Sequence, residues 1–200
     1  MKVLVTAFEP FGGEARNASL EVLRELPKEF AGWELVRQLL PVTFECEAQL
    51  YGAIRAHSPD AVLCMGQAAG SKTLRFEKIA VNIKNSRQAD NAGQVFRDTP
   101  ISPTEGLTLP SSLPLEQMTA AADTPELPAE ISYHAGTFVC NYTFYRLMEG
   151  FGVFHPAGFL HLPLADVQQG AHPGQPCFPA AQMAKQVVSA LTVLAETVIE

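Results

Sequence analysis

The chain has 200 residues, of which 47% are hydrophobic and 18% are charged, and its formal net charge at pH 7 is -7. This length fits one domain, residues 1–200, with enough apolar material for a substantial core. The acidic balance and the lack of any basic run argue against nucleic acid or an anionic membrane as a partner. No apolar stretch approaches the ~20 residues that a membrane-spanning helix needs.

The N-terminal residues and the cysteines favour a cytoplasmic location. Residues 1–6 lead directly into a strand-like pattern, without the apolar core and cleavage site of a signal peptide. The cysteines are far apart and form no C-x-x-C pair, so we expect free thiols in a reducing compartment and no structural zinc site. They are Cys46, Cys64, Cys140 and Cys177.

The first third of the chain alternates strand and helix patterns. The patterns predict a strand at 3–8, a helix from Asn17 or Ser19 to Pro27, a strand at 34–40, a helix at 44–57 and a strand at 60–66. Such alternation is typical of a mostly parallel sheet with helices on both faces, and therefore predicts an α/β fold.

The remainder is less regular. It predicts a strand at 74–83, a polar loop region at 84–106, an irregular proline-rich stretch at 107–130, a helix at 139–149, a strand at 159–164 and a closing helix from about Pro179. We find no repeat and no linker long enough to separate two domains.

A cysteine at the start of a predicted helix is the candidate nucleophile. In residues 135–141, Gly136 and Thr137 form a bend and cap that place Cys140 in the first helical turn. Unpaired backbone N–H groups and the positive end of the helix dipole favour thiolate there, so we expect a lowered pKa. The alternative is a buried structural cysteine, but none of the other three cysteines has such a setting.

A histidine in an apolar strand is the candidate base. His161 lies near the end of its predicted strand, and in open α/β sheets the strand ends carry the sites. The alternative is a core histidine whose ring nitrogens are satisfied. His134 is the one rival because it precedes Cys140 closely; the weaker candidates are His57, His155 and His172.

Two acids are candidates to orient the imidazole. Glu77 is a carboxylate in an otherwise apolar strand, and Asp90 lies in the polar loop that follows. A surface Glu77 paired with Arg75 or Lys78 is the structural alternative. Periodicity alone does not choose between the two acids.

Two loops are candidates to form a pocket. Phe8 and Phe11 bracket a Gly/Pro loop after the first strand, and Gln67 lies in the turn after the third. The alternatives are a plug over the core and an ordinary strand-to-loop turn. The first loop lacks the glycine spacing of a phosphate-binding motif, so a nucleotide site is poorly supported.

Several segments together resemble the pyroglutamyl peptidase I family of cysteine peptidases. They occur in the family's order and span nearly the whole chain. The similar segments are 8–13, 40–44, 66–70, 76–82, 90–93, 135–141 and 158–163.

The resemblance implies an exopeptidase that removes N-terminal 5-oxoproline (pyroglutamate) from small peptides, through a thioester on the enzyme. It implies Cys140 as nucleophile, His161 as general base and acid, and Glu77 as the residue that orients the imidazole. It also implies a single-domain three-layer α/β/α sandwich around a twisted, mostly parallel sheet. Members are typically cytoplasmic homo-oligomers, often tetramers, without a metal or other cofactor.

The expected substrate-binding residues follow from the hypothesis of this mechanism and this substrate. Phe8 and Phe11 are expected to hold the faces of the flat lactam ring, and Gln67 with backbone groups to satisfy its polar atoms. The backbone N–H of Cys140, with Arg87, is expected to stabilise the oxyanion. The remaining two expected binding residues are Phe138 and Val139.

Other functions remain open at the level of the sequence. One is a different cysteine amidase that acts on a small cyclic amide or a γ-glutamyl group. Another is a binding module that closes on 5-oxoproline without turnover. A third, disfavoured by the missing glycine fingerprint, is a Rossmann-like nucleotide binder.

Overall fold

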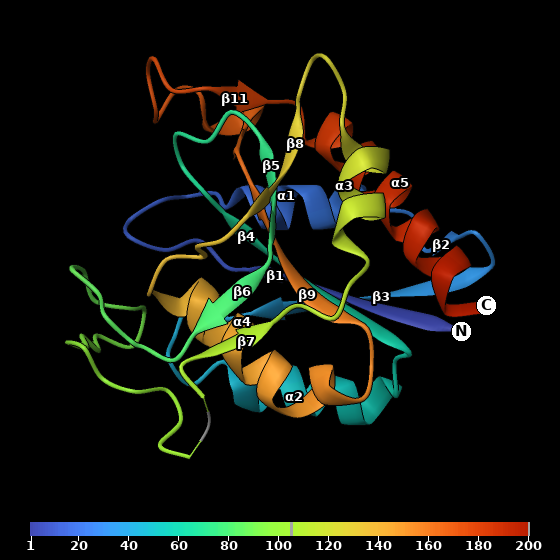
Figure 1. The fold of residues 1–200 in the computed structure, drawn as a ribbon. Coiled ribbons are helices and arrows are strands. Elements are labelled where there is room, and N and C mark those ends of the chain that lie inside the picture. Colours follow the sequence, from blue (N-terminus) through green and yellow to red (C-terminus); the bar gives the residue numbers. More distant parts are fainter. Residues whose placement is uncertain (105, 200) are drawn as a thin grey trace.

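A seven-stranded sheet forms the centre of the molecule, in the order β2-β3-β1-β4-β9-β5-β8 (Figure 1). The structure is a computed structural model that describes residues 1–104 and 106–199, with side chains up to residue 197. The strands of this sheet are β1 (Lys2–Phe8), β2 (Glu29–Phe30), β3 (Trp33–Leu40), β4 (Ala61–Gln67), β5 (Leu74–Glu77), β8 (Ala129–Ser132) and β9 (Ala157–Leu162).

The sheet is mostly parallel, as the alternation of strands and helices predicts. β1 pairs in parallel with β3 and β4, β4 with β9, and β5 with β8. Two pairings are antiparallel: the short edge strand β2 against β3, and β5 against β9. The second matters for the site because it brings residues from β5 beside the end of β9.

Helices cover both faces of the sheet and complete the predicted three-layer α/β/α sandwich (Figure 1). One face carries α1 (Ala18–Glu25), α3 (Leu115–Ala122) and α5 (Ala180–Ile199), and the other carries α2 (Glu47–His57) and α4 (Val139–Gly150). Each face has its own apolar core, because alternate residues of the buried strands point to opposite sides. No helix in the described part of the chain is long and apolar enough to span a membrane.

The proline-rich stretch at 107–130 is more regular than the sequence predicts. It contains β7 (Thr108–Pro110), α3 and β8. Pro114 stands at the N-cap of α3, where its missing N–H costs nothing, and Met118 and Ala122 bury against the α1/α5 layer. Counting prolines therefore misled the prediction, because their positions matter more than their number.

The predicted strand at 74–83 is two strands in two sheets. β5 stays in the main sheet, and β6 (Ile79–Val81) pairs with β7 in a two-stranded sheet. At the break, the Lys78 N–H donates to the Ser132 carbonyl and the Lys78 carbonyl accepts from Ser111 N–H. A second small sheet joins β10 (Leu164–Ala165) to β11 (Cys177–Phe178).

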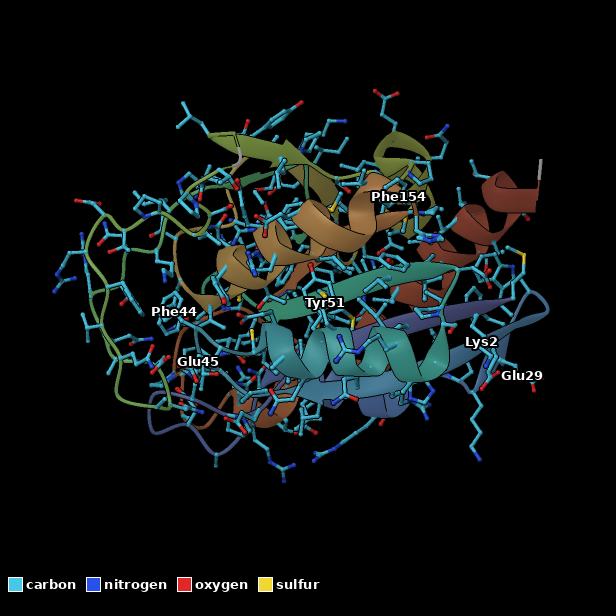
Figure 2. All side chains as sticks on the ribbon, turned by 90° about the horizontal axis from the view of Figure 1, so that it is seen from below. Lys2, Glu29, Phe44, Glu45, Tyr51 and Phe154 are labelled. Atoms are coloured by element: carbon cyan, nitrogen blue, oxygen red, sulfur yellow. The ribbon has the colours of Figure 1, made fainter. Side chains whose placement is uncertain are left out.

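The carboxyl ends of three neighbouring parallel strands meet at one edge. β1 ends at Phe8, β4 at Gln67 and β9 at Leu162, and such an edge is where open α/β sheets bind ligands. Figure 2 shows Phe44 at this end of α2, beside the long loop that precedes β7, with Lys2 and Glu29 at the opposite end of the molecule.

Candidate active site

Cys140 occupies the first turn of α4, as predicted. Phe138 is the N-cap and Cys140 is the second residue of the helix. The cap itself differs from the prediction: no side chain caps the helix, and the Thr137 hydroxyl donates to the Asn85 carbonyl 2.7 Å away. Gly136 makes the bend with a φ of 79°, a conformation that favours glycine.

The sulfur of Cys140 lies directly against β4. A Cβ atom on Gly66 would stand 2.9 Å from the Cys140 Sγ and 2.9 Å from the ring of Phe159. Real carbon atoms do not approach sulfur or ring carbon that closely, so only glycine fits between the strand and the helix here. Gly66 therefore allows the Cys140 sulfur to pack directly against the backbone of β4.

His161 and Glu77 form a buried hydrogen-bonded pair. The Nδ1 of His161 lies 2.8 Å from the Glu77 Oε1, with His161 7% exposed and Glu77 completely buried. Asp90, the other candidate acid, instead accepts hydrogen bonds from three backbone N–H groups, those of Phe44, Ala92 and Gln94. Asp90 thus holds a loop, and Glu77 is the carboxylate at the imidazole.

The strand register brings the pair and the sulfur to one face of the sheet. His161 is paired with Gly66 across β9 and β4, and Glu77 with Phe159 across β5 and β9. Paired residues and alternate residues of one strand share a face. The ring of Phe159 lies 4.9 Å from the ring of His161. The same Phe159 ring and the Cys140 sulfur both lie next to Gly66. Cys140, His161 and Glu77 therefore converge where β4, β9 and β5 meet α4.

The pKa of Cys140 moves opposite to the sequence prediction. Cys140 is partly buried, and its loss of contact with water, together with the negative charge of Glu77, raises the pKa of its thiol to about 12, while only its own backbone N–H lowers the pKa. A helix N-terminus stabilises an anion by about 0.3–1 kcal/mol, which is less than the cost of removing a thiolate from water. The prediction of a lowered pKa is therefore wrong in direction, and these surroundings favour the neutral thiol.

A small pocket opens beside Cys140, which is one of its lining residues. Five of the predicted binding residues line it, and Asn17 and Val42 line it as well. The five are Phe8, Phe11, Gln67, Phe138 and Val139. The sixth predicted residue, Arg87, is exposed and is not among the lining residues.

The residues that the sequence analysis missed had local but ambiguous signals. Asn17 caps α1 and accepts from the Ser19 N–H. The sequence predicts this cap correctly, but it does not predict that Asn17 lines the pocket. Val42 belongs to a segment noted only for its resemblance. Asn141 follows the cysteine, and its side chain bonds to the backbone of Val81 and Ile83.

All four cysteines are unpaired thiols, as predicted. Within the described residues, no group of three or more His, Cys, Asp or Glu side chains is arranged to hold a metal ion. Among the described residues, the polar side chains that line the pocket are the thiol of Cys140 and the amides of Gln67 and Asn17, and the His161–Glu77 pair lies on the sheet face against which the sulfur packs.

A cysteine at a helix start, beside a histidine that is oriented by a buried carboxylate, is the arrangement of a cysteine-type hydrolase. The family model described as pyroglutamyl peptidase matches residues 1–200. The chain belongs to this family of peptidases.

Individual relatives agree over most of their length. The pyrrolidone-carboxylate peptidase of Enterococcus faecalis is 41% identical over 172 residues, which cover 84% of this chain and 81% of that protein. The protein of the same name from a Thermoanaerobacter species is 38% identical over 200 residues and 98% of each chain.

Solved structures are similar as well. The pyrrolidone carboxyl peptidase of Thermus thermophilus superposes with a TM-score of 0.89 at 35% identity, covering 95% of this chain and 98% of that one. A variant of the Pyrococcus furiosus protein gives a TM-score of 0.91 at 30% identity, covering 99% and 100%. These likenesses confirm the predicted fold.

Proposed function

We propose that this protein is a cysteine exopeptidase that hydrolyses the amide bond after an N-terminal pyroglutamyl residue. Cys140 is the nucleophile, His161 the general base and then acid, and Glu77 the residue that orients the imidazole. The observation that carries the proposal is the 2.8 Å contact between His161 Nδ1 and Glu77 Oε1, on the sheet face against which the Cys140 sulfur packs. Family membership and the names of the relatives support the same activity.

The raised pKa of Cys140 determines how the first step proceeds. Because the resting group is a thiol, its proton moves to His161 as the sulfur attacks the pyroglutamyl carbonyl and the C–S bond forms. Glu77 stabilises the resulting imidazolium through the Nδ1 hydrogen bond. The backbone N–H of Cys140 is expected to donate to the oxyanion, an interaction worth about 10²–10³ in rate.

The remaining steps return every proton. The tetrahedral intermediate collapses, the C–N bond breaks, and the imidazolium protonates the leaving amine. Water then attacks the thioester while His161 takes its proton, the C–S bond breaks, and the proton returns to the sulfur. The products are 5-oxoproline and a peptide shortened by one residue.

The pocket suits a small, flat, uncharged lactam ring. The rings of Phe11 and Phe138 lie 6.2 Å apart, and Phe8 and Val42 add apolar lining. Polar groups are few, so each counts strongly toward specificity. A proline ring lacks the lactam carbonyl and would leave a donor of the pocket unpaired, at a cost of about 1–3 kcal/mol.

The expected setting is the cytoplasm, and the expected assembly is a homo-oligomer, by family resemblance a tetramer. The unpaired cysteines support a reducing compartment. Exposed apolar side chains after α4, Val153 and Phe154, supply apolar area for contacts between copies (Figure 2). Light scattering of the purified protein measures the number of copies.

The test is hydrolysis of a pyroglutamyl-fluorophore amide by the purified protein, with and without a chelator. The wild type is expected to cleave it equally in both conditions, since each step uses side chains of the chain itself. Cys140→Ser is expected to abolish turnover, and the control Cys177→Ser, outside the pocket, is expected to keep it. Full activity of Cys140→Ser would exclude the proposed nucleophile.

A further inference from the structure

Gln168 is a buried polar residue outside the pocket lining. It ends the short helix η2 (Asp166–Gln168), which follows β10, and is 2% exposed. Its side chain bonds to the Ala165 N–H at 3.0 Å and to the side chain of Gln67 at 2.9 Å. A more distant contact of 3.4 Å reaches the Arg16 carbonyl.

Two backbone N–H groups fix the orientation of both amides. A backbone N–H can only donate, so the atom of Gln168 beside Ala165 N–H is the oxygen and the other is the nitrogen. The same argument applies to Gln67, whose Oε1 accepts from Ala18 N–H at 2.8 Å. The Gln168 Nε2 therefore donates to an oxygen that a second donor already holds.

This arrangement leaves the Gln67 Nε2 as the group available to a ligand. It has no hydrogen-bond partner among the described residues, and Gln67 lines the pocket beside Cys140. If the amide were reversed, the nitrogen would face two donors and the oxygen would face the pocket. That pocket would favour a ligand N–H or a protonated ring amine over a carbonyl.

We propose that Gln168 is a positioning residue for substrate selection: it holds Gln67 as a hydrogen-bond donor, so that the pocket accepts a five-membered ring bearing a carbonyl and rejects one bearing an amine. The proposal rests on the proposed function, and it extends that function to a residue that does not touch the substrate. Gln168 acts only through Gln67.

The experiment compares Gln168→Glu with wild type on matched pyroglutamyl and prolyl amides. The glutamate keeps an oxygen for Ala165 N–H but places a second oxygen against the Gln67 Oε1, which favours the reversed amide. Losing one such hydrogen bond is expected to raise KM for the pyroglutamyl amide about tenfold with little change in kcat. The preference for pyroglutamyl over prolyl substrate is expected to fall by a similar factor.

The control is Gln169→Glu, which makes the same change at the exposed neighbouring position and is expected to behave as wild type. Gln168→Met removes the donor to Gln67 and the acceptor of the Ala165 N–H without adding a charge, in case the glutamate variant fails to fold. In a Gln67→Ala background the effect of either Gln168 substitution on KM is expected to vanish, which a merely structural role would not produce.

A second readout separates this inference from the catalytic proposal. Binding of 2-pyrrolidone, the lactam ring alone, is measured by calorimetry and needs no turnover. Weaker binding to Gln168→Glu and Gln168→Met supports the inference whether or not the wild type hydrolyses the amide. Unchanged binding and unchanged KM in folded variants, or an effect that persists without Gln67, overturns it.

Discussion

The position of the Cys140 sulfur depends on the absence of a Cβ atom at Gly66. A methyl group there would meet the sulfur and the Phe159 ring at 2.9 Å, so one of them must move. The proposed nucleophile would then leave its alignment with the substrate carbonyl, while the proposed binding pocket for the ring would be less affected.

We therefore expect Gly66→Ala to lower kcat by about 10²-fold with a much smaller change in KM, since a misplacement of about 1 Å has this effect. Steady-state kinetics on the pyroglutamyl amide measure the two constants. The control is Gly52→Ala in α2, where a Cβ would meet nothing within 4 Å. A Gly66→Ala enzyme with wild-type kcat would show that the contact does not position the sulfur.

Cys140 and the two candidate acids show which site residues a local sequence pattern can identify and which it cannot. The pattern identified Cys140 because its helix start is local, and the structure has it in the first turn of α4. The choice of Glu77 over Asp90 at the imidazole depends on the antiparallel pairing of β5 with β9, which no local pattern encodes. The same holds for Gln168, which reaches Gln67 from 101 positions away in the chain.

At the scale of elements, the side chain of Asn141 bonds α4 to the backbone of β6 and of the residues after it. Asn141 is completely buried and accepts from the Val81 N–H at 2.9 Å. Its amide nitrogen donates to the carbonyls of Val81 and Ile83. These bonds join the turn that carries Cys140 to the start of the loop beside the pocket.

Asn141→Ala leaves the Val81 N–H and the Ile83 carbonyl without this partner, while the Val81 carbonyl still accepts from the Ile83 N–H. We expect the free energy of unfolding to fall by about 2 kcal/mol, the cost of unsatisfied buried polar groups. Urea denaturation at neutral pH measures it, with the exposed Gln88→Ala as control. Asn141→Asp is expected to be no better than alanine, because its second oxygen faces the two carbonyls. A loss under 0.5 kcal/mol in Asn141→Ala would contradict this account.

Element boundaries were predictable where apolar periodicity was strong. The strand at 3–8 and the helix at 139–149 match β1 and α4 closely. The helix predicted at 44–57 begins at Glu47, because the turn around Phe44 is held by Asp90 from the distant loop. The sequence pattern misplaces the ends of helices and strands where contacts between distant segments determine them.

At the scale of the whole molecule, buried thiols make the free energy of unfolding depend on pH in the alkaline range. Burial raises the pKa of Cys46 and Cys64 from 9.0 to about 12, as it does for Cys140. The folded state thus keeps protons that the unfolded chain releases above about pH 9. The stability is fully present below pH 9 and declines between pH 9 and 12.

We expect the free energy of unfolding to fall in this window by at most about 1.4 kcal/mol per pH unit for each buried thiol. Denaturation midpoints measured from pH 7 to 11 follow the decline. Cys64→Ala removes one of these thiols and is expected to show a shallower fall, even though its stability at pH 7 is lower. Parallel curves for the two proteins would show that Cys64 does not contribute.

The central claim is that the neutral thiol of Cys140 becomes the acyl carrier once His161 takes its proton. Its most direct test is to mix enzyme with a pyroglutamyl substrate, quench in acid within the first turnover and map the modified peptide by mass spectrometry. The account predicts a pyroglutamyl group on the peptide that contains Cys140, and none in Cys140→Ser. An adduct on Cys46, Cys64 or Cys177, or turnover through no covalent adduct on any cysteine, would contradict it.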